Sequence, residues 1–75
     1  MTHQEREREK KTRFVICELS ELLRAIDDDC VGAIYKAVGE DERVTVWFTD
    51  NSKRTVDVTA DSLLALTRDV LRAMN

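Results

Sequence analysis

The fold is decided by residues 43–59, RVTVWFTDNSKRTVDVT, where apolar and polar residues alternate on both sides of a short polar turn. Side chains of a β-strand point to opposite faces in turn, so a period of two predicts a strand with one buried and one polar face. The segment therefore predicts two antiparallel strands, Arg43–Asp50 and Lys53–Thr59, joined at Asn51-Ser52. The buried face would hold Val44, Val46, Phe48, Val56 and Val58, opposite a face with Thr45, Trp47, Thr49, Thr55 and Asp57.

Upstream of this pair, Val31–Val38 predicts another strand, closed by a polar turn at Gly39-Glu40-Asp41-Glu42. Its alternation is weak, because it places apolar atoms on both faces. Such a strand is central in its sheet or lies in a subunit contact. Tyr35 either points inward or joins Trp47 on the polar face.

The N-terminal part predicts one helix from about residue 5 to Asp27. The charged extension over residues 1–12 either lengthens this helix through close ion pairs or frays. The apolar stripe is Val15, Leu19, Leu22 and Ile26 at helical spacing, broadened by Leu23. An alternative makes Phe14–Cys17 a short strand, with Ser20 capping a helix behind it. Asp27, Asp28 and Asp29 oppose the helix dipole, so we expect them in the following loop.

The C-terminal segment predicts a helix with Thr59 as its N-cap and Asp61 and Ser62 near its positive end. Leu63, Leu66, Val70 and Met74 form its stripe, flanked by Leu64 and Leu71. The expected fold is α+β: a two-layer α-β-β-β-α arrangement in which an antiparallel three-stranded meander has both helices on one face.

Length and composition set further bounds. The 75 residues predict a single domain, 1–75, without a membrane span or secretory segment. A net charge of −3 opposes general binding of nucleic acid, which requires excess lysine and arginine. Cys17 and Cys30 are expected to be reduced, buried thiols of a protein located in the cytoplasm of a host cell. No metal or cofactor is expected, because no cysteine or histidine spacing matches a metal site.

No nucleophile, base and orienting group come together in the sequence, since the only histidine is His3 in the charged extension and the serines have turn or cap roles. We therefore expect a protein that is not an enzyme and acts by binding. The first candidate for binding is Trp47, which is either covered by another part of the chain or anchors an interface. Lys36, Arg43, Lys53 and Arg54 form a basic rim or simply solubilise the sheet edges.

The acidic runs Asp27–Asp29 and Glu40-Asp41-Glu42 are the other candidate surfaces, as solvated loops or as imitations of phosphate spacing. Residues Val44–Met74, with a strand, a polar turn, a second strand leading into Val58-Thr-Ala-Asp-Ser62 and a closing helix, resemble a group of short phage and prophage proteins. That group is of the general kind that includes anti-CRISPR proteins and other anti-defence proteins.

The resemblance implies a phage-encoded protein that inhibits a bacterial immune component by binding. One alternative is a homo-oligomeric sponge for a nucleotide signal of that immune system, held by Arg43, Lys53, Arg54 and aromatic stacking. A second is a structural or assembly accessory. The surfaces also favour a homo-oligomer, with a two-fold dimer first.

Overall fold

The alternating stretch forms neighbouring strands of an antiparallel sheet, as predicted. The computed structural model describes residues 2–74, and its sheet has the order β1-β2-β3. The strands are β1 Cys30–Val38, β2 Asp41–Phe48 and β3 Lys53–Asp57. Val44 pairs with Val56 and Thr45 with Thr55, so the valines share one face and the threonines the other. This register confirms the assignment of the two faces.

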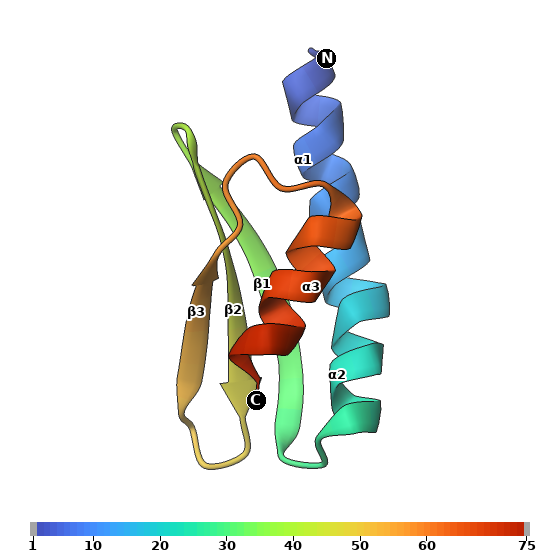
Figure 1. Ribbon diagram of the computed structural model, residues 1–75, viewed down its shortest axis with the longest axis vertical. Helices are drawn as coiled ribbons and strands as arrows, with labels where there is room; N and C mark the ends of the chain where they lie inside the picture. The colour runs from blue at the N-terminus through green and yellow to red at the C-terminus, as the bar shows by residue number, and fades with distance from the viewer. Residues whose placement is uncertain (1, 75) are drawn as a thin grey trace.

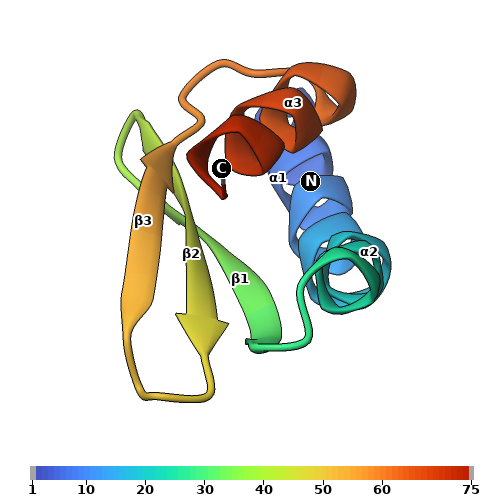
Figure 2. The same cartoon turned by 60° about the horizontal axis from the view of Figure 1, so that its bottom comes forward.

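All the helices lie on one face of the sheet, which confirms the two-layer α+β arrangement (Figures 1 and 2). One continuous helical stretch comprises α1 His3–Arg13, a π-helical segment η1 Phe14–Leu19 and α2 Ser20–Ile26. It lies along β1 and extends down the long axis of the molecule, whose extents are 37 × 19 × 19 Å. The last helix, α3 Leu63–Ala73, covers the part of the sheet nearer β3. Between residues 2 and 74, no helix has both the length and the apolar character needed to cross a membrane.

The core lies between this helical layer and the inner face of the sheet. Burying its aliphatic side chains supplies the main stabilisation, at about 25 cal/mol for each Å² removed from water. Its buried members come from every helix but α1, from strands β1 and β2, and from the residue after β3: Val15, Leu19, Leu23, Cys30, Ala33, Tyr35, Val44, Val46, Val58, Leu66 and Val70.

The predicted stripe of the N-terminal helix is wrong in its second half. Leu23 is buried, whereas Leu22 and Ile26 are 42% and 59% exposed. The cause is the π-helical segment, in which the Ser20 N–H donates to the carbonyl of Val15, five residues back. This wider turn keeps residues spaced by four on one face and rotates Leu22 away from the core. The helical alternative for Phe14–Cys17 is the one observed, although it is not a regular α-helix.

Ser20 links the helix to the free edge of the sheet. Its buried hydroxyl accepts the Ala33 N–H at 3.0 Å and donates to the carbonyl of Val15 at 2.7 Å, with the carbonyl of Ala33 at 3.1 Å as a second acceptor. Arg24 donates to the Val31 carbonyl at 3.3 Å, beside the bulge between Cys30 and Gly32. These bonds occupy backbone groups of β1 that point away from β2, so the helix protects an edge that would otherwise remain open to pairing.

Two further predictions need correction. The N-cap of α3 is Ser62, whose hydroxyl accepts the Ala65 N–H at 3.2 Å, and not Thr59. Thr59 instead donates to Asp57 and accepts the Glu42 N–H in the connection after β3. Cys30 is buried as expected, but Cys17 is exposed because the π-helical segment turns it outward.

Candidate functional site

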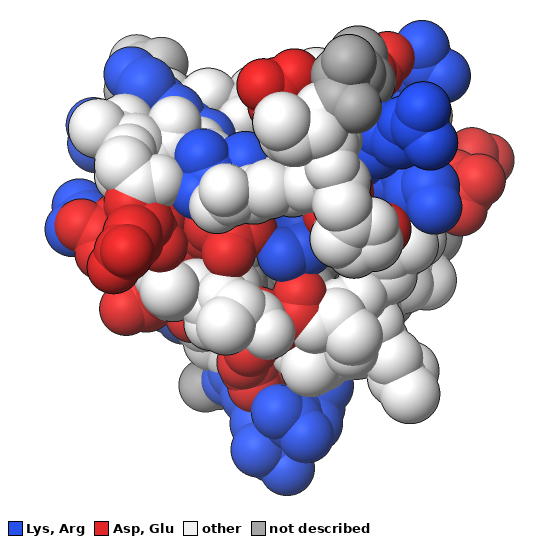
Figure 3. Space-filling model, turned by 90° about the horizontal axis from the view of Figure 1, so that it is seen from above, with Lys and Arg blue, Asp and Glu red and all other residues white. Residues whose placement is uncertain are grey.

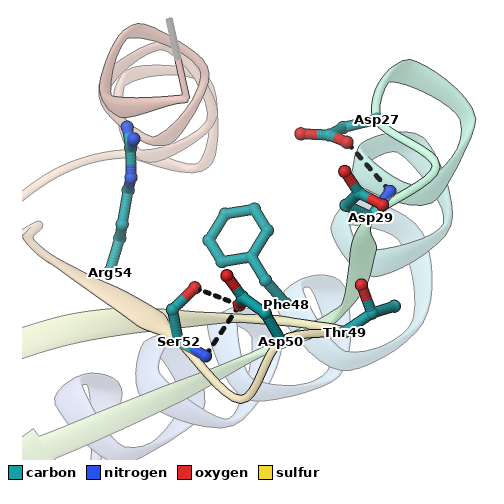
Figure 4. A pocket seen from close by; sticks show the side chains of 7 residues that line it. All are labelled: Asp27, Asp29, Phe48, Thr49, Asp50, Ser52 and Arg54. Carbon is teal, nitrogen blue, oxygen red and sulfur yellow. Dashed lines mark hydrogen bonds between the residues drawn. The ribbon is translucent and has the colours of Figure 1, made fainter.

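The structure brings Asp50, in the turn between β2 and β3, to the same end of the molecule as the Asp27–Asp29 loop (Figure 4). The Thr49 N–H donates to the Asp29 carbonyl at 2.9 Å and joins the two loops. Between them is an open hollow of about 340 Å³. The hollow is lined by Asp27, Asp29, Phe48, Thr49, Asp50, Ser52 and Arg54, and we call it the acidic hollow.

Local hydrogen bonds hold two of these carboxylates in place. Asp27 Oδ1 accepts the Asp29 N–H at 2.9 Å, which shapes the loop after α2. Asp50 Oδ1 accepts both the N–H of Ser52, at 2.9 Å, and its hydroxyl, at 2.5 Å. These bonds, led by the hydroxyl, lower the pKa of Asp50 and keep its carboxylate ionised. Each loop therefore presents a negative charge in a defined position.

Arg54 lies across the acidic hollow from the aspartates, but its guanidinium is used within the fold. It donates to the carbonyl of Ala73 at the C-terminus of α3, where a positive charge also complements the helix dipole. Because Arg54 pairs with Val46, it is on the helix-covered face. Lys36, Arg43 and Lys53 are on the opposite face. The predicted rim of four basic residues is therefore divided between two faces.

Trp47 is on the face opposite the core valines, as predicted, and is 38% exposed. No helix in the described part of the chain covers this face (Figure 2). The ammonium group of Lys53 lies 5.2 Å from the centre of the Trp47 ring, within cation–π distance. No helix of residues 2–74 therefore covers Trp47, which lies beside the Lys53 side chain and is 38% exposed.

The second acidic run is at the other end of the sheet. Glu40 is in the turn between β1 and β2, and Asp41 begins β2; both are exposed. Seen from above, this end shows interspersed basic and acidic side chains (Figure 3). The two acidic runs therefore do not form one surface, and only the Asp27–Asp29 run gains a further carboxylate from another loop.

Glu42 is not part of an exposed turn, which corrects its assignment as a surface residue. It lies in β2 and is only 7% exposed. Its Oε1 accepts hydrogen bonds from Lys11 Nζ at 2.6 Å and from the Tyr35 hydroxyl at 2.5 Å, and its Oε2 accepts the Ala60 N–H at 2.8 Å. This carboxylate joins α1, β1 and the loop before α3, so its role is structural.

Burial alone would raise the pKa of Glu42, but the bonds from Lys11, Tyr35 and Ala60 outweigh it and lower the pKa to about 2. Burial and the neighbouring Glu42 raise the pKa of Tyr35. Tyr35 therefore points inward as a neutral donor and does not join Trp47. The inward orientation of Glu42 could have been predicted from the period-two pattern, because position 42 shares the inward register of Val44 and Val46.

The rest of the described chain adds little chemistry. Within residues 2–74, no group of three or more histidine, cysteine, aspartate or glutamate side chains is placed to hold a metal ion. Asp61 and Asp69 are neighbours, and burial together with the Asp69 carboxylate raises the pKa of Asp61.

No protein-family model, curated protein or solved structure matches this chain.

Proposed function

We propose that this protein acts by binding, and that the acidic hollow with its flanking Asp28 is the surface that meets the partner. One observation carries the proposal: two separate loops place Asp27–Asp29 and Asp50 around one hollow. The partner would present a basic surface, since complementary charge accelerates encounter and sets the orientation of the complex. Phe48, at the centre of the hollow, supplies apolar contact.

The more specific proposal is an anti-defence inhibitor. A basic surface in a bacterial immune component serves to bind phosphates of nucleic acid, and carboxylates held at separate positions occupy such a surface in their place. The net charge of −3 supports this choice, as does the resemblance to short phage proteins of mostly unknown function, which are of the general kind that includes anti-CRISPR proteins. The proposed activity is competitive and non-enzymatic, with no cofactor.

The nucleotide-sponge alternative has less support. It requires Arg43, Lys53 and Arg54 to act together, whereas Arg54 lies on the face opposite Arg43 and Lys53. Its guanidinium also bonds to the carbonyl of Ala73. The competitive inhibitor is therefore the preferred function.

The test uses the separation of the two acidic runs. Purified immune effectors that bind nucleic acid are assayed for association by biolayer interferometry and for loss of nucleic-acid binding. A variant with Asp27, Asp29 and Asp50 each changed to Lys should lose association at least tenfold, and the affinity of the original protein should fall as salt rises.

The control changes Glu40 and Asp41 to Lys at the opposite end of the sheet, which alters the net charge by four, against six in the triple variant. It should retain association, because these residues are remote from the acidic hollow. A loss in the control in proportion to its charge change would show a general effect of net charge and refute a specific surface. Retention of inhibition by the triple variant would refute the role of the acidic hollow.

A further inference from the structure

We propose that the uncovered face of the sheet is the interface of a homodimer, in which Trp47 of each copy packs into a hollow of the other. This inference is independent of the proposed function, because it concerns the opposite side of the sheet from Arg54 and Phe48. The open face carries the outward residues of the three strands, which include five charged residues, two threonines and the large apolar residues Ile34, Val38 and Trp47.

The composition of β1 is the first argument. A strand that is apolar on both faces is normally central, yet β1 is at the edge of this sheet. Its outward side chains Ile34 and Val38 are 45% and 66% exposed, although the strand's free edge is already protected by the helix. With Trp47 they are three large apolar side chains exposed on a face that no helix of the described chain covers, and association would remove them from water.

The open face carries an aromatic side chain and a hollow on either side of its middle. Trp47 lies near one end of β2, and a hollow of about 430 Å³ lies toward the other end. That hollow is lined by Lys36, Val38, Asp41, Arg43, Thr45 and Thr55. Such a pair of features suits a two-fold interface, since each copy supplies both.

The charges agree with one position of the two-fold axis. Ile34, Thr45 and Thr55 form the middle row across the strands. We place the two-fold axis midway between two facing sheets and parallel to this row. A residue two positions from the row on one side then faces, in the second copy, the residue of the same strand two positions from the row on the other side. Trp47 then meets Arg43 of the second copy, a cation–π pair. Lys53 meets the carboxylate of Asp57 of the second copy.

The expected dimer is small and therefore weak. The three strands have 9, 8 and 5 residues; at about 3.4 Å per residue and about 4.8 Å between strands they give a footprint of about 360 Å² per copy, below the roughly 800 Å² of a standard interface. We expect dissociation in the micromolar range. Because the strands of the two copies run antiparallel across the axis, the two acidic hollows would face opposite ends of the dimer.

Sedimentation equilibrium from about 1 to 500 μM tests the assembly. We expect the mass to rise from one chain to two chains and then to remain constant. Trp47 is the only tryptophan, so its emission should shift to shorter wavelength over the same concentrations as its ring leaves water. A single-chain mass at every concentration, or a dimer with unchanged Trp47 emission, would overturn the proposal.

Variants locate the interface. Trp47→Thr should weaken the dimer roughly 30-fold or more, as for a central aromatic anchor. The matched control is Leu64→Thr, which removes an 81% exposed residue from α3 on the helical layer, and it should leave the dimer unchanged. Dimerisation that is lost only in Leu64→Thr would place the interface on the helices and refute the proposal.

A charge exchange provides a second test that does not depend on Trp47. Lys53→Glu should weaken the dimer about tenfold, because it faces Asp57 of the second copy with a like charge. Adding Asp57→Lys should restore most of the affinity. Arg6→Glu, an equal charge change on exposed α1, is the control and should have little effect. Failure of the double variant to recover, with its fold intact by circular dichroism, would refute the proposed axis.

Discussion

Replacing Glu42 by Gln removes the charge around which three parts of the fold are joined. The carboxylate accepts bonds from Lys11, Tyr35 and the Ala60 N–H, and these lower its pKa from 4.5 to about 2. A shift of this size corresponds to roughly 3 kcal/mol of folding free energy at neutral pH. Gln keeps the shape and one acceptor but leaves the buried Lys11 ammonium without its counter-charge.

The assay is urea unfolding followed by circular dichroism, supported by thermal melts. At pH 7 we expect Glu42→Gln to lower the free energy of unfolding by about 3 kcal/mol, a large part of the total for so small a domain. At about 4–8 °C per kcal/mol, the melting temperature should fall by roughly 12–24 °C. The matched control, Glu40→Gln in the exposed turn, should change stability by less than about 0.5 kcal/mol.

The pH dependence of this difference shows whether it arises from the charge of Glu42 or from the shape of its side chain. Because the pKa of Glu42 is lower in the folded than in the unfolded protein, its contribution is complete above about pH 4.5 and is lost as the pH falls toward 2. The difference between the original protein and Glu42→Gln should therefore be constant from pH 7 to about pH 5 and nearly vanish by about pH 2. A difference below about 1 kcal/mol at pH 7, or one that persists unchanged at low pH, would refute the reasoning.

Three further outcomes follow from buried or strained positions. Ser20→Ala should lower the free energy of unfolding in urea by about 1–3 kcal/mol, because it removes the buried hydroxyl that is hydrogen-bonded to the β1 edge. An unchanged free energy would show that water or a backbone shift replaces these bonds. Ala60 has a φ of 62°, in the left-handed region that favours glycine. The free energy of unfolding should therefore stay the same or rise slightly in Ala60→Gly and fall by more than about 1 kcal/mol in Ala60→Val. The reverse order would show that the backbone at Ala60 is not strained. In thiol titration with a disulfide reagent, exposed Cys17 should react quickly, whereas Cys30, whose burial raises its pKa, should react only at the rate of opening; equal rates would contradict the assigned burial.

Local periodicity explains why the sheet could be predicted. The alternation around Asn51-Ser52 depends on strand geometry alone, so it assigned Trp47 to the face opposite Val44 and Val46 correctly. The α+β order and the two-layer arrangement follow from the same patterns, since each apolar stripe needs a partner surface. The limits of the elements were less accurate: β2 begins at Asp41, where a turn up to Glu42 was expected, and Ser62 rather than Thr59 caps α3.

The composition of the candidate site, unlike the sheet, could not be predicted from local periodicity. The Asp27–Asp29 loop was identified from its charge, but its association with Asp50 required the Thr49–Asp29 backbone bond between loops about twenty residues apart. Arg54 was grouped with Lys53 as a neighbour in sequence, whereas the strand sends their side chains to opposite faces and the end of α3 then engages Arg54.

The sequence by itself therefore determined the strands, the two faces of the sheet and the helices that cover one of them, because these depend on side-chain spacing along a regular backbone. Only the tertiary structure decided which groups compensate the charge of the inward-facing Glu42, since Lys11 is 31 residues away. It also decided that Leu22 is exposed, since the π-helical turn at Ser20 shifts the helix face. A buried charge or a widened turn is stable only when partners from distant parts of the chain supply the compensating bonds, and no local pattern records those partners.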